Sequence, residues 1–284
     1  MGTIEDVETD PARETQAPAG VCVQSGAFLL ELSLDWIVRR ASENIYKLLG
    51  ESHVTLIGEP LGHFVKGQPL HDLRNLFSRL SGTTGIGRAY AVRLTDDPDL
   101  FDVAFQLSSG RVLLEAVPSS GSFGEAFGTV GGLIAGLANS HGQALLEGSA
   151  RRMRALTGYD RVTLICGDYR TESTRGAFAR PAEPADLPVL VADTSSSGVA
   201  IFPRGDDEAS ASALLRCPGE DALRALAEDG IRSVMRVAFA VDDLSGEFRC
   251  DSRSPRQPSF ELHAAAELFA QLFAMRLEID RLRG

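Results

Sequence analysis

Few residues in this chain could carry chemistry, and their spacing forms no recognisable site. The four cysteines are far apart and include no C-x-x-C pair, so we expect reduced thiols rather than a disulfide framework or a zinc site. They are Cys22, Cys166, Cys217 and Cys250. No two of the five histidines have the i, i+4 spacing that places both on one helix face as metal ligands. No Ser/His/Asp set is recognisable either, so the residue types predict no metal site and no catalytic residue.

Composition excludes several classes of protein. The 284 residues are enough for two domains, each with its own core. The formal net charge of −11 argues against a nucleic-acid partner, because phosphate binding needs clustered Lys and Arg. No apolar run is long enough to cross a bilayer, and the acidic start does not resemble a secretory signal. We therefore expect a cytoplasmic protein with neither a nucleic-acid nor a membrane partner.

The hydrophobic pattern predicts a polar arm at 1–20 and two units joined by a Gly- and Ser-rich linker at 119–128. In the first unit we expect helices before Gly50, which suits a helix C-cap, and at 71–80. The strands expected there are 27–32, 36–41, 88–95, 100–106 and 111–118. In the second unit we expect helices at 130–139, 143–156, 219–228 and 260–282, and strands at 161–166, 189–192, 232–241 and 247–252.

Several segments, in the correct order, resemble one protein family. They are VQSGAFLLELSLDWIVRRASENIYKLLG, ARRMRALTGYDRV, DGIRSVMRVAFAVDDLSGEFRCDSRSPR and SFELHAAAELFAQLFAMRLE. Over about 21–281 the chain resembles the PAS–GAF part of a bacteriophytochrome. The resemblance implies an α+β fold, with a PAS domain at 21–122 and a GAF domain at 123–284, each an antiparallel sheet flanked by helices. It also implies a lasso at about 193–213, which would make a figure-of-eight knot if the arm threads it.

The same resemblance identifies the positions that should hold a bilin chromophore, and this chain departs from the family at most of them. The family's attachment cysteine lies in the arm, where this chain has none; Cys22 falls inside the next segment. Ile165 stands where the family has a tyrosine, Ala222 where a helix carries a histidine, and Asp251 where the first of two paired histidines follows the cysteine that corresponds to Cys250. A helix expected after 181–187 has no counterpart. The candidates for a cofactor pocket are thus Cys22, Ile165, Ala222, Cys250 and Asp251.

These departures favour a phytochrome-derived regulatory or protein-interaction module without covalent bilin binding or photochemistry, and with no cofactor. An alternative is a sensor or haem-degrading protein that holds haem or biliverdin non-covalently. In that case His263 would be a candidate haem ligand, and Arg175, Arg180 and Arg204 would be candidate partners for propionates. A third interpretation is a redox sensor that uses Cys22 or Cys250.

The helix predicted at 260–282 carries the remaining functional signal, because it is longer than one small domain needs to cover its sheet. The equivalent phytochrome helix packs against its partner chain. We therefore expect a homodimer through Phe269, Phe273 and Leu277, together with a protein signalling partner.

Overall fold

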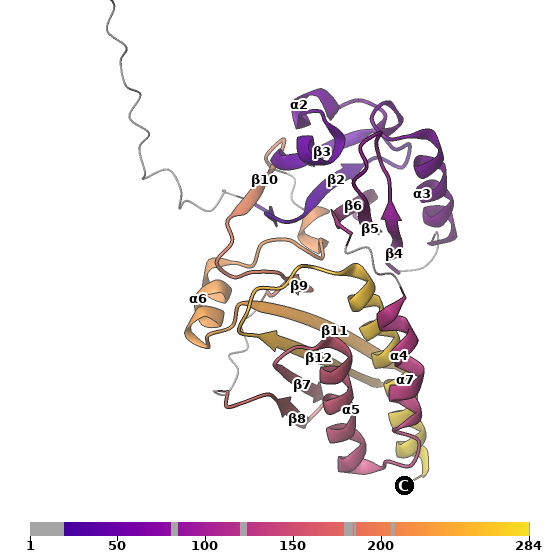
Figure 1. Cartoon of the computed structure of the whole chain (residues 1–284), viewed down its shortest axis with the longest axis vertical. Helices are drawn as coiled ribbons and strands as arrows, with labels where there is room; N and C mark the ends of the chain where they lie inside the picture. Colours follow the sequence, from indigo (N-terminus) through magenta and orange to yellow (C-terminus); the bar gives the residue numbers. More distant parts are fainter. Residues whose placement is uncertain are drawn as a thin grey trace, which may run out of the picture.

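The computed structural model describes residues 20–80, 85–119, 124–178, 184, 186–205 and 208–283. Figure 1 shows two units, each built around one sheet, with the long C-terminal helix running along the second. The predicted α+β architecture, with antiparallel sheets flanked by helices, is confirmed. The arm at 1–19 lies outside the described residues, so the predicted knot stays a prediction.

The first unit is a seven-stranded antiparallel sheet in the order β1-β10-β3-β2-β6-β5-β4. Its strands are β1 (Cys22–Gln24), β2 (Phe28–Leu32), β3 (Val38–Ser42), β4 (Gly87–Val92), β5 (Phe101–Ser108), β6 (Arg111–Pro118) and β10 (Gly198–Phe202). The helices α1 (Tyr46–Leu49), α2 (His53–Leu56) and α3 (Gly67–Leu80) accompany it. Gly50 caps α1 with φ 78°, as its position in the sequence predicts.

The second unit is a five-stranded antiparallel sheet in the order β8-β7-β12-β11-β9. Its strands are β7 (Arg161–Cys166), β8 (Tyr169–Thr174), β9 (Leu190–Val191), β11 (Ser233–Val241) and β12 (Leu244–Ser252). Three helices gather on one face of this sheet, and Figure 1 shows them side by side: α4 (Glu125–Ala135), α5 (Gly142–Thr157) and α7 (Phe260–Arg283). The short α6 (Glu220–Glu228) lies apart from them.

Strand alternation gives the second sheet two different faces. On the face toward α5 and α7, Val237, Phe239 and Phe248 belong to a large apolar core. The side chains that alternate with the core residues along each strand, such as Arg249 and Asp251 on either side of the core residue Cys250, point to the opposite face, which we call the outer face. The outer face is therefore where the sheet carries its polar residues.

The two units share a strand, because β10 comes from the second half of the chain but lies between β1 and β3 of the first sheet. Ala200 pairs with Cys22 on one side, and Ile201 pairs with Ser42 on the other. We call residues 192–217, which carry β10, the return segment. Its end is held by Glu115 of β6, whose carboxylate oxygens each accept a backbone N–H at 2.8 Å, from Leu214 and Leu215.

Several details differ from the sequence prediction. The strands β1, β8 and β10 and the short helix α2 were not predicted: β8 is a polar edge strand, and β10 lies in a stretch rich in Ser and Gly that is typical of a loop. The strand expected from Trp36 begins at Val38, because Trp36 occupies a turn with φ 63°. The helix α4 starts at Glu125, inside the predicted linker.

Within the described part of the chain, no helix combines the length and apolar character that a bilayer crossing requires.

Candidate functional site

The outer face of the second sheet brings together two of the predicted pocket residues. Strands β7 and β12 pair so that Arg161 lies opposite Asp251, Thr163 opposite Arg249, and Ile165 opposite Glu247. Ile165 and Asp251 therefore share the outer face.

Asp251 is the centre of a buried ion cluster. Its Oδ2 accepts a hydrogen bond from Nε of Arg161 at 2.9 Å, and its Oδ1 accepts one from Nε of Arg249 at 2.8 Å. All three side chains are almost completely excluded from solvent. Because removing charges from water is costly unless they are paired, the two guanidinium groups fix this carboxylate in place. Both oxygens of Asp251 are thus committed within the chain.

The space beside this cluster is filled by the chain's own side chains. The guanidinium carbons of Arg161 and Arg253 lie 4.8 Å and 3.9 Å from the ring centroid of Phe178, within the range of a cation–π contact. Phe178 also packs against a small apolar cluster of α6, β9 and β11 that contains Ala222. Its buried members are Leu187, Val191, Ala222, Leu226, Ile231 and Val234. Ala222 is therefore a core residue here.

Cys250 does not join the outer face. Adjacent residues of a strand point to opposite sides, so Cys250 faces the helices while Asp251 faces away. Cys250 is fully buried in the large core, and this burial raises the pKa of its thiol above the ordinary value. Its expected role in a pocket or as a redox sensor is therefore corrected, because a thiol buried away from water stays protonated.

Cys22 lies in β1 of the first sheet, where it pairs with Ala200 of the return segment. It is mostly buried, and Cys217 is the neighbouring cysteine. The structure thus separates Cys22 from the other pocket candidates, which all belong to the second sheet or to α6.

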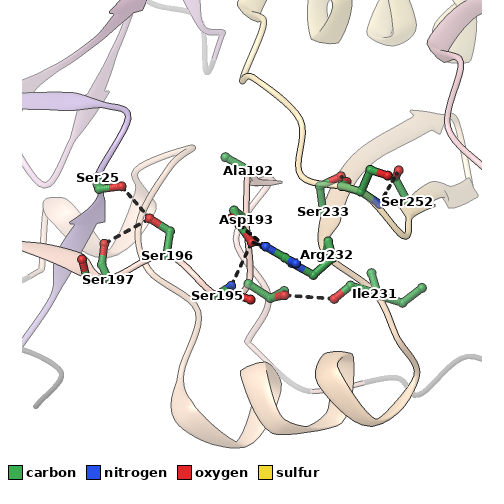
Figure 2. Close-up of polar contacts among 12 residues, drawn as sticks. Ser25, Ala192, Asp193, Ser195, Ser196, Ser197, Ile231, Arg232, Ser233 and Ser252 are labelled. Atoms are coloured by element: carbon green, nitrogen blue, oxygen red, sulfur yellow. Dashed lines mark hydrogen bonds and ion pairs between the residues drawn. The ribbon is translucent and has the colours of Figure 1, made fainter. Parts of the chain in front are cut away.

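An arginine–aspartate pair beside the outer face was missed from the sequence (Figure 2). Arg232, the residue before β11, donates from Nε to Oδ1 of Asp193 at 2.9 Å and from Nη2 to Oδ2 at 3.0 Å. This two-pronged geometry is the strong form of an Arg–carboxylate contact. Asp193 opens the return segment and also accepts the N–H of Ser195 at 2.9 Å. Further along, Ser196 contacts Ser25 of the first unit at 2.5 Å between hydroxyls. Arg232 lies in one of the segments that resemble the bacteriophytochrome family, and this was the only signal in the sequence that could have pointed to it.

His263 is not available as a haem ligand in this conformation. Its Nδ1 accepts from Nη2 of Arg88 at 2.9 Å, and its Nε2 lies 3.2 Å from the backbone oxygen of Arg236. Burial lowers the pKa of His263, so the ring is held neutral with its proton on Nε2.

The arginines proposed for propionates do not converge. Arg175 is an exposed residue after β8, whereas Arg204 follows β10 of the first sheet and lies over the ring of Phe202. Arg180 lies outside the described residues. Within the described part of the chain, no group of three His, Cys, Asp or Glu side chains could hold a metal ion.

The residues expected at a dimer interface mostly face inward. Phe269 and Phe273 are fully buried and pack edge-on against Phe248, with ring centroids 6.1 Å and 5.3 Å apart. Leu277 is partly buried and packs against the same core. The prediction that the two phenylalanines reach a partner is corrected, because the aromatic stripe of α7 is the side that covers the sheet. The large apolar side chains that α7 exposes are Leu268, Met275, Ile279 and Leu282.

A cavity of about 170 Å³ lies at the β9 end of the sheet. It is lined by residues that include Tyr159, Val191, Met235 and Arg256. Sites for drug-sized ligands span roughly 300–1,000 Å³, so this cavity is too small for a tetrapyrrole without rearrangement. Three pockets of about 410–480 Å³ lie elsewhere on the described part of the chain, and none of them is lined by Ile165, Ala222, Cys250 or Asp251.

Solved structures share this arrangement of two units. The chromophore-binding domain of Stigmatella aurantiaca phytochrome P1 superposes with a TM-score of 0.73 at 23% identity, covering 90% of this chain and 95% of that one. The fold is that of a bacteriophytochrome chromophore-binding domain. The chromophore-binding domain of an unusual bacteriophytochrome from R. palustris is similar, with a TM-score of 0.74, 21% identity, and coverage of 96% and 99%. No protein-family model and no curated protein matches the chain.

The bacteriophytochrome fold implies a bilin, and the residues at the corresponding positions do not fit one held in the family's manner. Ile165 and Ala222 offer no hydrogen-bonding group, and both oxygens of Asp251 are committed to arginines. A bilin needs several donors and a counter-charge converging on one space. The ring of Phe178 lies against Arg161 and packs on the apolar cluster that contains Ala222.

Proposed function

We propose that this chain is a regulatory or protein-interaction module that keeps the bacteriophytochrome fold but has lost covalent bilin binding and photochemistry. One observation carries the proposal: Asp251 is buried between Arg161 and Arg249, and the ring of Phe178 lies against Arg161, where a chromophore pocket would have to open. Inserting a bilin would separate these charges from their partners and displace the apolar cluster around Ala222. The comparison structures are chromophore-binding domains by their own descriptions, and that property does not transfer at this level of identity.

The second part of the proposal is that the module works as a homodimer through α7. The exposed side chains Leu268, Met275, Ile279 and Leu282, with the half-buried Leu272 between the first two, follow each other at alternating steps of four and three residues. This spacing forms a narrow apolar seam of the kind that pairs two helices in a coiled coil. A second copy of α7 would match the seam by symmetry. Signals could then pass between the units of two chains along this helix.

The absorption spectrum tests the first part. The full chain is produced in cells supplied with haem and biliverdin, purified by gel filtration, and compared with the Stigmatella aurantiaca chromophore-binding domain prepared in the same way. We expect no visible absorption from this chain and a far-red band from the control. A Soret or far-red band that stays with the protein would overturn the proposal and favour the non-covalent tetrapyrrole sensor or haem-degrading protein.

A further inference from the structure

The backbone places Cys22 and Cys217 directly opposite each other. Strand β1 has β10 on one side, and on its other side it pairs with the end of the return segment, where Val23 bridges to Arg216. The N–H of Gln24 donates to the oxygen of Leu215 at 3.0 Å, and the N–H of Cys217 donates to the oxygen of Cys22 at 2.7 Å. Residues opposite each other in a hydrogen-bonded antiparallel pair have Cα atoms about 5.5 Å apart, which is inside the range that disulfides span.

Both sulfurs also lie over the same residue, Gly198 of β10. A Cβ added at Gly198 would lie 2.5 Å from the sulfur of Cys217 and 2.6 Å from that of Cys22. The glycine therefore leaves room for both sulfurs side by side. A hydrogen bond from the Cys217 thiol lowers the pKa of Cys22, and the same interaction raises the pKa of Cys217. This asymmetry suits an attacking thiol with a resolving thiol beside it.

We propose that Cys22 and Cys217 are a reversible dithiol–disulfide switch, oxidised by a peroxide. The thiolate sulfur of Cys22 attacks one oxygen of hydrogen peroxide and the O–O bond breaks. The departing hydroxide takes up a proton to form water, and Cys22 becomes a sulfenic acid. The sulfur of Cys217 then attacks the sulfenic sulfur, the S–O bond breaks, and the departing hydroxide takes the thiol proton to form a second water. Two thiols and one peroxide thus give one disulfide and two waters, and an external dithiol reverses the reaction.

The position of the pair gives the bond a consequence for the fold. Cys22 lies in the first strand of the first sheet, whereas Cys217 lies three residues before the first residue of α6, Glu220. A disulfide would fasten the end of the return segment to β1 and hold the first unit to the region around α6. This inference is independent of bilin loss and of the α7 dimer.

The pair differs from the other two cysteines in accessibility. Cys217 is half-buried, which opens one side of the pair to a small oxidant. Cys166 and Cys250 both lie in the large core of the second unit, and burial raises the pKa of each thiol. Neither belongs to the first sheet, so the structure offers matched control cysteines within the same chain.

Peroxide treatment of the folded full-length chain tests the switch. After treatment, the chain is unfolded in urea, its remaining thiols are blocked with iodoacetamide, and the unreduced digest is analysed by mass spectrometry. We expect one cross-linked peptide pair joining Cys22 and Cys217, loss of two of the four alkylatable thiols, and recovery of both with dithiothreitol. The Cys166→Ser control should behave like the wild type. Cys217→Ser should stop at a sulfenic acid on Cys22 that dimedone traps, and Cys22→Ser should form no cross-link.

Two outcomes would overturn the inference. One is a peroxide-treated wild type, folded by circular dichroism, in which Cys22 and Cys217 are alkylated as fully as in the untreated protein. The other is a cross-link that forms only after the chain is unfolded with urea, since the folded geometry would then not be its cause. If Cys217→Ser fails to fold, the wild-type cross-link and its reversal still decide the question.

Discussion

Arg88 of β4 donates from Nη2 to Nδ1 of His263 on α7, so a strand of the first sheet is hydrogen-bonded to the long helix of the second unit at 2.9 Å. Nη2 of Arg88 also forms an ion pair with the carboxylate of Glu267, one turn further along α7, at 2.8 Å. The other ring nitrogen of His263 reaches the backbone oxygen of Arg236 on β11. A single buried histidine therefore joins three elements, and its neutral form is the one that this arrangement requires.

The burial of His263 predicts a loss of stability on acidification. Its pKa is lowered in the folded state, so below about pH 6.5 the unfolded chain takes up a proton that the folded chain does not. The contribution of His263 to the free energy of unfolding should therefore fall as pH drops below 6.5 and stop falling only below the lowered pKa. Urea unfolding between pH 7.5 and 5 measures this slope. The His263→Gln variant should lose this component, whereas a variant of an exposed histidine, His71→Gln, should keep it; equal slopes in all three proteins would contradict the prediction.

The buried carboxyl group of Glu115 predicts a loss of stability as pH rises, the opposite of the contribution of His263. Loss of hydration raises the pKa of Glu115 to about 7, although hydrogen bonds from Leu214 and Leu215 oppose the shift. The folded chain keeps a proton that the unfolded chain releases near pH 4.5, so this group makes the protein less stable as pH rises from 4.5 to 7. The change amounts to about 3 kcal/mol, at about 1.4 kcal/mol per pH unit. In Glu115→Gln this slope should be absent in urea unfolding. A variant of an exposed carboxylate, Glu125→Gln, is the control. A wild-type slope in Glu115→Gln would rule out Glu115 as the source.

Asp251→Asn tests the ion cluster on the outer face. The change leaves Arg161 and Arg249 buried without their carboxylate, so we expect a loss of about 3–5 kcal/mol in the free energy of unfolding. Asp243→Asn, at an exposed position in the turn before β12, should change it by less than about 0.5 kcal/mol. A double change to apolar residues, Arg161→Met with Asp251→Leu, should recover part of the loss because fewer charges remain buried. If Asp251→Asn unfolds at the wild-type urea concentration, the cluster does not stabilise the fold.

Ile279→Arg tests the apolar seam of α7. The side chain is 44% exposed, so the substitution should leave the monomer folded but place a charge in the centre of the proposed helix pair. Sedimentation velocity should show the wild type as a dimer and Ile279→Arg as a monomer with the same circular dichroism spectrum. Leu107→Arg changes a side chain that is 56% exposed on the first unit, and it should remain a dimer. A wild-type monomer at micromolar concentration, or a dimeric Ile279→Arg, would exclude this interface.

The sequence predicted the elements whose pattern is local and strong. The long apolar runs of β11 and α7 were placed within a residue or two, and the resemblance predicted two antiparallel sheets flanked by helices. The facing of α7 was not predictable, because Leu268, Phe269, Leu272 and Phe273 are apolar on adjacent sides of one helix. Only the packing of Phe269 and Phe273 against the sheet shows which side is buried.

Most features that the sequence did not predict are contacts between residues far apart in the chain. Strand alternation alone would have separated Cys250 from Asp251, since neighbours in a strand face opposite ways. In contrast, nothing near Cys22 indicates that Cys217 lies opposite it, because the contact depends on where the return segment crosses the first sheet. The pairing of Asp193 with Arg232 has the same origin.

The strand β10 sets a limit on how this chain can be divided. A fragment cut at the linker near 119–128 would take β10 away from the first sheet and leave the backbone groups of β1 and β3 without their shared neighbour. An open edge of that kind invites pairing with other molecules. The two units are therefore not interchangeable building blocks: gene fusions or truncations that move one without the return segment would produce an aggregation-prone half rather than a smaller protein.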